Sequence, residues 1–162
     1  MASQGMTALA NFTVATAQAT VTFSNIPATY RDLRLVISCK STTGGVAMLI
    51  PVNGDTTSTY LSVSMYGTGS TTGSRSLTQA GLWLELTSST SELNLITVDF
   101  LDYSVTDKHK TILARSGIAG SQVTSATAAR WPQTSAITSF TIPASGDTWQ
   151  AGSTFTLYGV SA

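Results

Sequence analysis

The stretch that decides the fold class reads Leu33-Arg34-Leu35-Val36-Ile37-Ser38-Cys39. Its residues Leu33, Leu35 and Ile37 are apolar and recur with a period of two. Successive side chains of a β-strand point to opposite faces of a sheet, so this period predicts a strand with one buried face. Cys39 ends the stretch and is the only cysteine, which excludes an intramolecular disulfide. We expect it to act as a small buried hydrophobe rather than as a nucleophile.

Similar short runs recur along the chain and are separated by turn residues. We expect further strands at Val21–Phe23, Val46–Val52, Tyr60–Tyr66, Leu82–Leu86, Leu93–Leu101, Lys110–Ile118, Ile137–Ile142 and Phe155–Val160. In one of these runs, Leu61, Val63 and Met65 alternate with Ser62 and Ser64. About ten short strands at this spacing are typical of a sandwich or a barrel.

Helical patterns are almost absent from the sequence. β-Branched residues and hydroxyls dominate, and no window keeps apolar residues at helical spacing for three turns. The Ala-rich Ser125–Arg130 has room for one helical turn at most. Antiparallel pairing follows from the short connections, because parallel strands need long crossovers. The predicted fold is therefore an all-β antiparallel β-sandwich, and a jelly roll is the specific arrangement expected for a double sheet of this length.

Residues 1–162 are expected to form a single domain, with the first strands beginning near residue 7. The segment 67–76 has the Gly/Ser composition of a linker, but predicted strands flank it closely. A domain boundary there would leave two halves too small to be stable alone, so we expect a mobile surface loop. Tight turns are predicted at Asn53-Gly54-Asp55 and at Gly44-Gly45, because these residues tolerate the positive φ angles of hairpin turns.

The charge composition narrows the classes of partner. Only 10% of the residues are charged, and the formal net charge is zero. A nucleic-acid binder needs a basic face to replace the counterions of phosphates, and no basic excess exists to build one. A polybasic patch or a long apolar stretch for a membrane is also lacking. Ser and Thr make up nearly a third of the chain, which fits either a β protein that packs against other proteins or a soluble β domain with an unusual polar surface.

Residues for catalysis are few. His109 is the only histidine and lies between Lys108 and Lys110, two cations that do not activate a histidine as a base. We expect it to be a solvated surface residue. The Gly-x-Ser-x-Gly motif of a nucleophile elbow is absent from the sequence.

The carboxylates also fail to form a recognisable site. Glu85 and Glu92 lie near one another in the chain, as do Asp99 and Asp102, but glycoside hydrolysis needs two carboxylates that face each other across a cleft. One histidine and one cysteine exclude the usual zinc spacings, and Asp99, Asp102 and Asp107 do not match a calcium-binding EF-hand loop. We therefore expect no enzyme activity, no cofactor and no bound metal.

Several strings, taken together, resemble a family of small virion proteins of tailed bacteriophages. These strings are Val21-Thr22-Phe23-Ser24-Asn25-Ile26-Pro27-Ala28-Thr29-Tyr30 with Arg31-Asp32-Leu33-Arg34-Leu35-Val36, Val52-Asn53-Gly54-Asp55 with Tyr60, Tyr66-Gly67 with its Ser/Gly loop, Val98-Asp99-Phe100-Leu101-Asp102-Tyr103, Trp131 with Ala136-Ile137-Thr138-Ser139, and Gly152-Ser153-Thr154-Phe155-Thr156-Leu157-Tyr158-Gly159-Val160. In order and spacing they cover nearly the whole chain.

The resemblance implies a β-sandwich protein on the virion surface, with a structural role and no catalytic residues. It implies a head decoration, or cement, protein that binds the major capsid protein, stabilises the shell and sits as a homotrimer where capsomers meet. The alternative is a tail fibre or receptor-binding tip that binds a glycan on the host surface. The chain starts almost at once with its first strand and leaves no room for a fibre shaft, which favours the head. Because the N-terminus lacks a secretory signal pattern, we expect synthesis in the host cytoplasm and assembly onto the capsid surface.

Three tryptophans are the candidate interface residues. Interfaces favour aromatic anchors, so Trp83, Trp131 and Trp149 are candidates for contacts with a second subunit or with the capsid protein. Each can equally belong to the core, because tryptophan is highly buried on average in any fold. In the alternative function they would line a sugar-binding groove. With so few charges, we expect the contacts to be apolar and hydroxyl hydrogen bonds rather than ion pairs.

Overall fold

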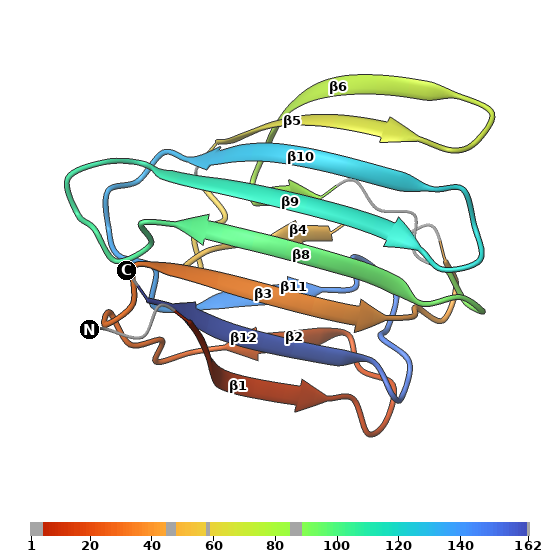
Figure 1. Cartoon of the computed structure of the whole chain (residues 1–162), viewed down its shortest axis with the longest axis horizontal. Helices are drawn as coiled ribbons and strands as arrows, with labels where there is room; N and C mark the ends of the chain where they lie inside the picture. Colours follow the sequence, from red (N-terminus) through yellow and green to blue (C-terminus); the bar gives the residue numbers. More distant parts are fainter. Residues whose placement is uncertain (1–4, 45–47, 58, 85–88, 162) are drawn as a thin grey trace.

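The computed structural model describes residues 5–44, 48–57, 59–84 and 89–161. Within these ranges every regular element is a β-strand, and no helix occurs. The strands of Figure 1 are β1 (Met6–Thr13), β2 (Thr20–Phe23), β3 (Asp32–Cys39), β4 (Met48–Ile50), β5 (Tyr60–Gly67), β6 (Thr72–Gln79), β7 (Leu82–Leu84), β8 (Asn94–Leu101), β9 (Lys110–Ile118), β10 (Thr124–Trp131), β11 (Phe140–Pro143) and β12 (Thr154–Val160). The all-β class predicted from the period-two runs is confirmed.

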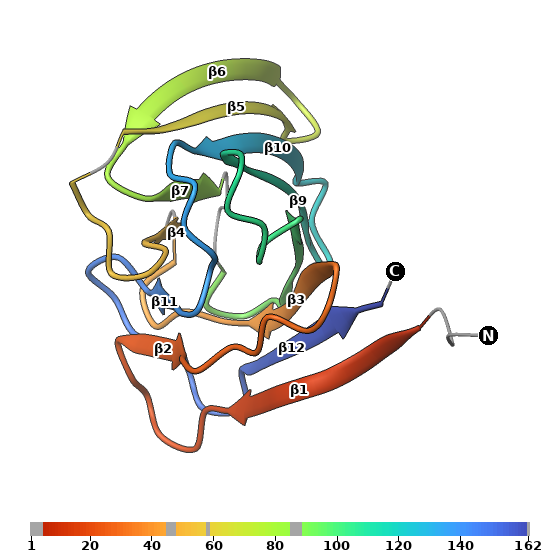
Figure 2. The ribbon, with the colours of Figure 1, turned by 90° about the vertical axis from the view of Figure 1, so that its left-hand side faces the viewer.

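Eight of the strands form one antiparallel sheet in the order β1-β12-β3-β8-β9-β10-β5-β6. The others form two short antiparallel pairs, β11 with β2 and β4 with β7. Figure 2 shows the large sheet curving around these pairs, which cover one of its faces. The predicted antiparallel sandwich is thus confirmed, with one hydrophobic core over the described residues. Its two layers are unequal, which differs from the double-sheet division of a regular jelly roll.

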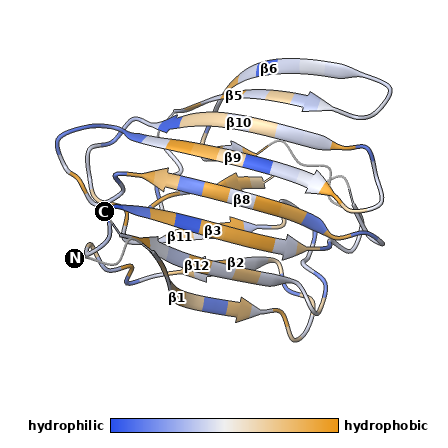
Figure 3. Cartoon of the chain, in the orientation of Figure 1, coloured by the Kyte–Doolittle hydropathy of each residue, from blue (hydrophilic) through white to orange (hydrophobic). Residues whose placement is uncertain are grey.

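The core lies between the large sheet and the two short pairs. On β3, the residues Leu33, Leu35, Ile37 and Cys39 all point inward and are fully buried. Figure 3 shows hydrophobic and hydrophilic residues alternating along β3 and β8 in the middle of the sheet. Burial raises the pKa of the Cys39 thiol to about 12, so this side chain stays protonated. It is the small buried hydrophobe that the sequence predicts.

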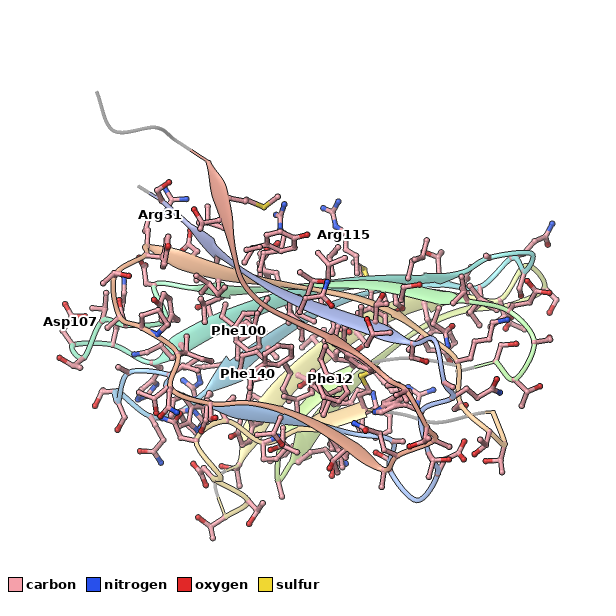
Figure 4. All side chains as sticks on the ribbon, turned by 90° about the horizontal axis from the view of Figure 1, so that it is seen from below. Phe12, Arg31, Phe100, Asp107, Arg115 and Phe140 are labelled. Carbon is pink, nitrogen blue, oxygen red and sulfur yellow. The ribbon has the colours of Figure 1, made fainter. Side chains whose placement is uncertain are left out.

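Stacked phenylalanines join the two layers. Phe100 of β8 stacks on Phe140 of β11 with ring centroids 5.0 Å apart, and Phe23 of β2 tilts against the same ring at 5.5 Å. Figure 4 shows Phe100 and Phe140 between the layers. Aromatic pairs at such distances contribute attraction beyond the area they bury, so these rings fix the short β2–β11 pair against the centre of the large sheet.

Two of the three candidate interface tryptophans belong to the core. Trp131 is 2% exposed, stacks on Tyr60 with centroids 6.4 Å apart and donates its indole N–H to Asp55 Oδ2 at 3.0 Å. Trp149 is fully buried and donates its indole N–H to the carbonyl of Ile142 at 3.2 Å. Their interface assignment is therefore wrong, because no partner can reach a side chain that this chain itself encloses.

The predicted turn at Asn53-Gly54 is confirmed. Asn53 and Gly54 have φ angles of 53° and 70°, and the Asp55 N–H donates to the carbonyl of Val52 at 2.9 Å. The Asn53 side chain also fixes the chain before β11, because its Oδ1 accepts the N–H of Thr138 at 2.9 Å. In the second predicted turn Gly44 has a φ of 76°. Several predicted positions lie outside the described residues, namely Gly45, Val46, Ala47, Glu85 and Leu86.

Two sequence predictions are wrong about local structure. The segment 67–76, predicted as a mobile loop, contains the end of β5, the hairpin turn and the first part of β6. The turn is closed by the Thr68 N–H donating to the Thr71 carbonyl at 2.9 Å. The segment Ser125–Arg130, given at most a helical turn, is part of strand β10. Pairing of β10 with β9 on one side and β5 on the other satisfies its backbone, which overrides the helical preference of its alanines.

Lys110 is a buried charged residue at the start of β9. The residue has no exposed surface, and its Nζ donates hydrogen bonds to the backbone carbonyls of Val105, Lys108 and Thr134. Burial lowers the pKa of Lys110, but each of the three ammonium protons has an acceptor. The side chain therefore holds the loop before β9 and the segment after β10 together.

Replacement of Lys110 should destabilise the protein. Lys110→Met keeps the aliphatic stem but leaves three carbonyls without their donor, so we expect the free energy of unfolding to fall by about 2–4 kcal/mol. Urea denaturation followed by circular dichroism measures the change. The matched control is Lys108→Met, which removes an exposed lysine paired with Asp102 and should have little effect. Equal losses in the two variants would contradict the structural role of Lys110.

A hydrogen-bonded clasp joins the loop after β3 to the loop between β11 and β12. The Asp147 carboxylate accepts hydrogen bonds from the Thr42 hydroxyl, from the Thr43 N–H at 2.8 Å and from the Thr148 N–H at 2.7 Å. Partial desolvation alone would raise the pKa of Asp147, but these hydrogen bonds outweigh it and lower the pKa well below its ordinary value of 3.8.

The clasp should make stability depend on pH. Because the folded pKa of Asp147 lies below the unfolded one, its contribution is fully present above the unfolded pKa and is lost as pH falls through the folded pKa. At pH 7 we expect Asp147→Asn to melt below the wild type, with the gap narrowing as pH falls from about 5 towards about 2. Calorimetry across this range measures both, with Asp107→Asn, at an exposed carboxylate, as the control. A gap that stays constant with pH would refute the role of the carboxylate.

Candidate functional site

The residues considered for chemistry are dispersed over the structure. His109 is exposed in the loop before β9, as predicted. Asp99 pairs with Arg34 and Asp102 pairs with Lys108, so each carboxylate has a cation of its own. Across residues 5–44, 48–57, 59–84 and 89–161, no three His, Cys, Asp or Glu side chains are grouped as ligands for a metal ion.

Strand β5 presents its apolar side chains to solvent and its serines to the core. Leu61, Val63 and Met65 are 43%, 54% and 63% exposed, whereas Ser62 and Ser64 are 2% and 1% exposed. This is the reverse of the usual half-buried strand, in which the apolar residues face the core. The exposed apolar side of β5 is therefore the first sign of an interaction surface.

The orientation of β5 is set at its first residue. Tyr60 is fully buried, stacks on Trp131 and donates its hydroxyl to the carbonyl of Asp55 at 3.1 Å. The period of two then turns Ser62 and Ser64 inward as well. Ser64 shares a hydrogen bond with Thr127 of β10 at 2.9 Å, while the buried Ser62 Oγ has no hydrogen-bond partner among the described atoms.

The exposed apolar side chains wall a groove on the outer face of the large sheet. Strand β10 lies between β5 and β9, and its outward residues Ala126 and Ala128 form a low floor. The cross-strand neighbours of these alanines are Met65 and Val63 on β5 and Arg115 and Leu113 on β9. Methyl groups thus lie between longer side chains on the two neighbouring strands, and they form the low part of the groove where it crosses β10.

The groove has a volume of about 590 Å³ and extends across five adjacent strands, from β5 to β3. Its lining residues are Arg34, Val63, Met65, Thr97, Asp99, Leu113, Ala114, Arg115, Ala126, Thr127 and Ala128. None of them is aromatic, and the stacking surface that a sugar ring prefers is missing from this lining. The groove suits apolar side chains of another protein, which bind by shape and by exclusion of water.

The polar side chains of the groove leave a positive balance. Arg34 donates to both oxygens of Asp99 at 2.6 and 3.1 Å, so the carboxylate of the lining is already paired. Arg115 is exposed on β9, and Figure 4 shows it on the opposite side of the large sheet from the core phenylalanines. Arg130, also exposed, follows the alanine floor along β10. Neither Arg115 nor Arg130 forms an ion pair with a described residue.

Comparisons with known proteins leave the family open. A scan against protein-family models finds none that matches the chain, and a search of curated proteins finds no relative. No helix among the described residues is long and apolar enough to cross a membrane. Any assignment of function therefore depends on the residues and on the geometry of the groove.

Sequence reasoning did not single out the groove. Alternation of Leu61, Val63 and Met65 with serines is the same whichever side faces the core, so the pattern cannot show which side is exposed. The available signal was the position of Tyr60 and Tyr66, two large rings with the same parity as the serines. Of the three candidate tryptophans, Trp83 on β7 is half-buried, and its role at an interface stays a prediction.

Exchange of inward and outward residues on β5 should have opposite effects. Met65→Ser removes an exposed side chain and should change the free energy of unfolding by no more than about 0.5 kcal/mol. Ser64→Met forces a larger side chain into the packed layer and removes the hydrogen bond to Thr127, so we expect a loss of about 1–3 kcal/mol. Chemical denaturation of the two variants measures this difference. A larger loss for Met65→Ser than for Ser64→Met would show that β5 faces the other way.

Proposed function

We propose that the protein is a structural protein of a tailed-bacteriophage virion, a decoration or cement protein that binds the major capsid protein on the head and stabilises the shell. The single observation that carries the proposal is the exposed apolar groove on the outer face of the large sheet. The sequence strings that resemble small virion proteins supply the biological setting.

The groove is suited to permanent attachment. Large exposed apolar patches on soluble proteins often mark interaction sites, and in the groove lining Val63, Met65 and Leu113 are each more than 40% exposed. Burying such side chains fully stabilises a complex by about 1.5–3 kcal/mol each, and those already half-covered contribute proportionally less. The groove lies on hydrogen-bonded strands, so little ordering entropy is lost when a partner binds.

Decoration proteins occupy repeated positions on a shell, and we propose a homotrimer where capsomers meet, because closed cyclic symmetry is the usual form of a soluble oligomer. Trp83, half-buried on β7, is the remaining tryptophan candidate for a contact between subunits. Synthesis in the host cytoplasm and a final location on the capsid surface follow from this role.

The decoration role should be visible in copy number and in resistance to salt. Quantitative mass spectrometry of virions that carry this protein should find hundreds of copies per particle. A count of tens or fewer would instead indicate a component of the tail. Washing with rising sodium chloride should leave it bound, because apolar contacts do not weaken as salt screens charges.

Met65→Asp, which places a charge in the groove, should abolish retention on stripped shells, whereas Leu93→Asp, at an exposed leucine absent from the groove lining, should bind normally. Release of wild type by moderate salt alone would refute the proposal.

A further inference from the structure

Two arginines stand at the two ends of the alanine floor. Arg115 lies beside Ala126 in the cross-strand register, and Arg130 lies on β10 itself, four residues after Ala126. With a rise of about 3.3 Å per residue, the backbone positions of the two arginines are separated by about 13 Å in the direction of β10, with Arg115 in the groove lining and Arg130 just outside it. The apolar residues Ala128, Val63 and Leu113 lie side by side between them.

The charges of the groove are not balanced within this protein. The formal net charge of the chain is zero, yet the lining holds Arg34 and Arg115 against the single carboxylate of Asp99. Asp99 is held by two hydrogen bonds from Arg34, which leaves Arg115 and Arg130 exposed without a described acid. Acidic groups of a binding partner would therefore complement these two exposed arginines.

A second copy of this chain does not supply them. Face-to-face contact of two grooves would place the same unpaired arginines near each other, and the groove carboxylate of either copy is already occupied. Like charges brought together in this way cost free energy. A nucleic acid fits no better, because a phosphate backbone needs a track of many cations, and here two unpaired arginines flank an apolar floor.

We propose that the groove docks onto an acidic and apolar surface of a partner protein, with carboxylates opposite Arg115 and Arg130 and apolar side chains between them. This inference rests on the proposed function, since it names the chemistry of the shell surface that the groove contacts. The two parts of the groove act at different stages. The exposed arginines attract and orient the partner during approach, and the apolar floor and walls determine how long the complex lasts.

The first experiment measures binding kinetics on head shells stripped of this protein. At low salt, Arg115→Gln/Arg130→Gln should slow association by about tenfold and remove most of its salt dependence, while the dissociation rate stays within about twofold of wild type. Arg75→Gln is the matched control, because this exposed arginine lies over the Tyr66 ring and outside the groove lining. Wild-type binding with no effect of the double variant on association would overturn the inference and leave the proposed function intact.

The second experiment needs no phage particle. Methyl signals of Met65, Ala126 and Ala128 are followed by nuclear magnetic resonance while a short peptide that alternates leucine and aspartate is added. We expect these signals to shift with that peptide, and not with one in which lysine replaces aspartate or with a single-stranded oligonucleotide. If shells do not bind but the acidic peptide does, the inference stands and the capsid assignment fails. Equal shifts with the lysine peptide, or stronger ones with the oligonucleotide, would overturn the inference.

Discussion

A side chain on a β-strand faces one side of its sheet or the other, and the short strands of this protein cover only one side of the large sheet. The covering pairs, β2 with β11 and β4 with β7, have strands of three or four residues, whereas the large sheet has strands of seven to nine. On the six strands from β12 to β5, most residues of one parity are buried and those of the other parity face solvent, whereas no residue of the two edge strands β1 and β6 is buried. The core and the groove both arise because the short strand pairs cover only one face of the large sheet.

The connection between β4 and β5 decides which parity goes inward at one end of the sheet. The Asn53-Gly54 turn brings Asp55 under Trp131, whose indole N–H it accepts, and Tyr60 donates to the carbonyl of the same aspartate. These polar contacts around the stacked Tyr60 and Trp131 rings determine which side chains of β5 face the core. Buried hydrogen bonds of this kind specify one arrangement among many, since any other would leave polar groups unpaired.

The sequence predicted those parts of the fold in which local pattern and tertiary environment agree. The run from Leu33 to Cys39 alternates and lies in the centre of the sheet, and the Asn53-Gly54 turn has the φ angles that its residues favour. Prediction failed where the structure of a segment depends on the strands that pair with it. Strand β10 is rich in alanine and becomes a strand because it is paired on both sides, and β6 has the composition of a linker but pairs along its length with β5. The groove was missed for the same reason, because an alternating pattern does not show which of its two faces is buried. Burial of Trp131 and Trp149 likewise depends on strands that are distant from them in the sequence.

The pairing of the first and last strands has a mechanical consequence. β1 and β12 are antiparallel neighbours at one edge of the large sheet in Figure 1. Met6 therefore lies opposite Val160, and Ser161 donates hydrogen bonds to the carbonyl of Gly5. Tension applied between Gly5 and Ser161 would break the hydrogen bonds between β1 and β12 one pair after another, beginning at this end of the two strands. Tension applied along the strands of the outer face would load the long ladders of β8, β9 and β10 in shear, with many hydrogen bonds resisting together. The molecule is therefore mechanically anisotropic, weak between its ends and strong along the strands that carry the groove.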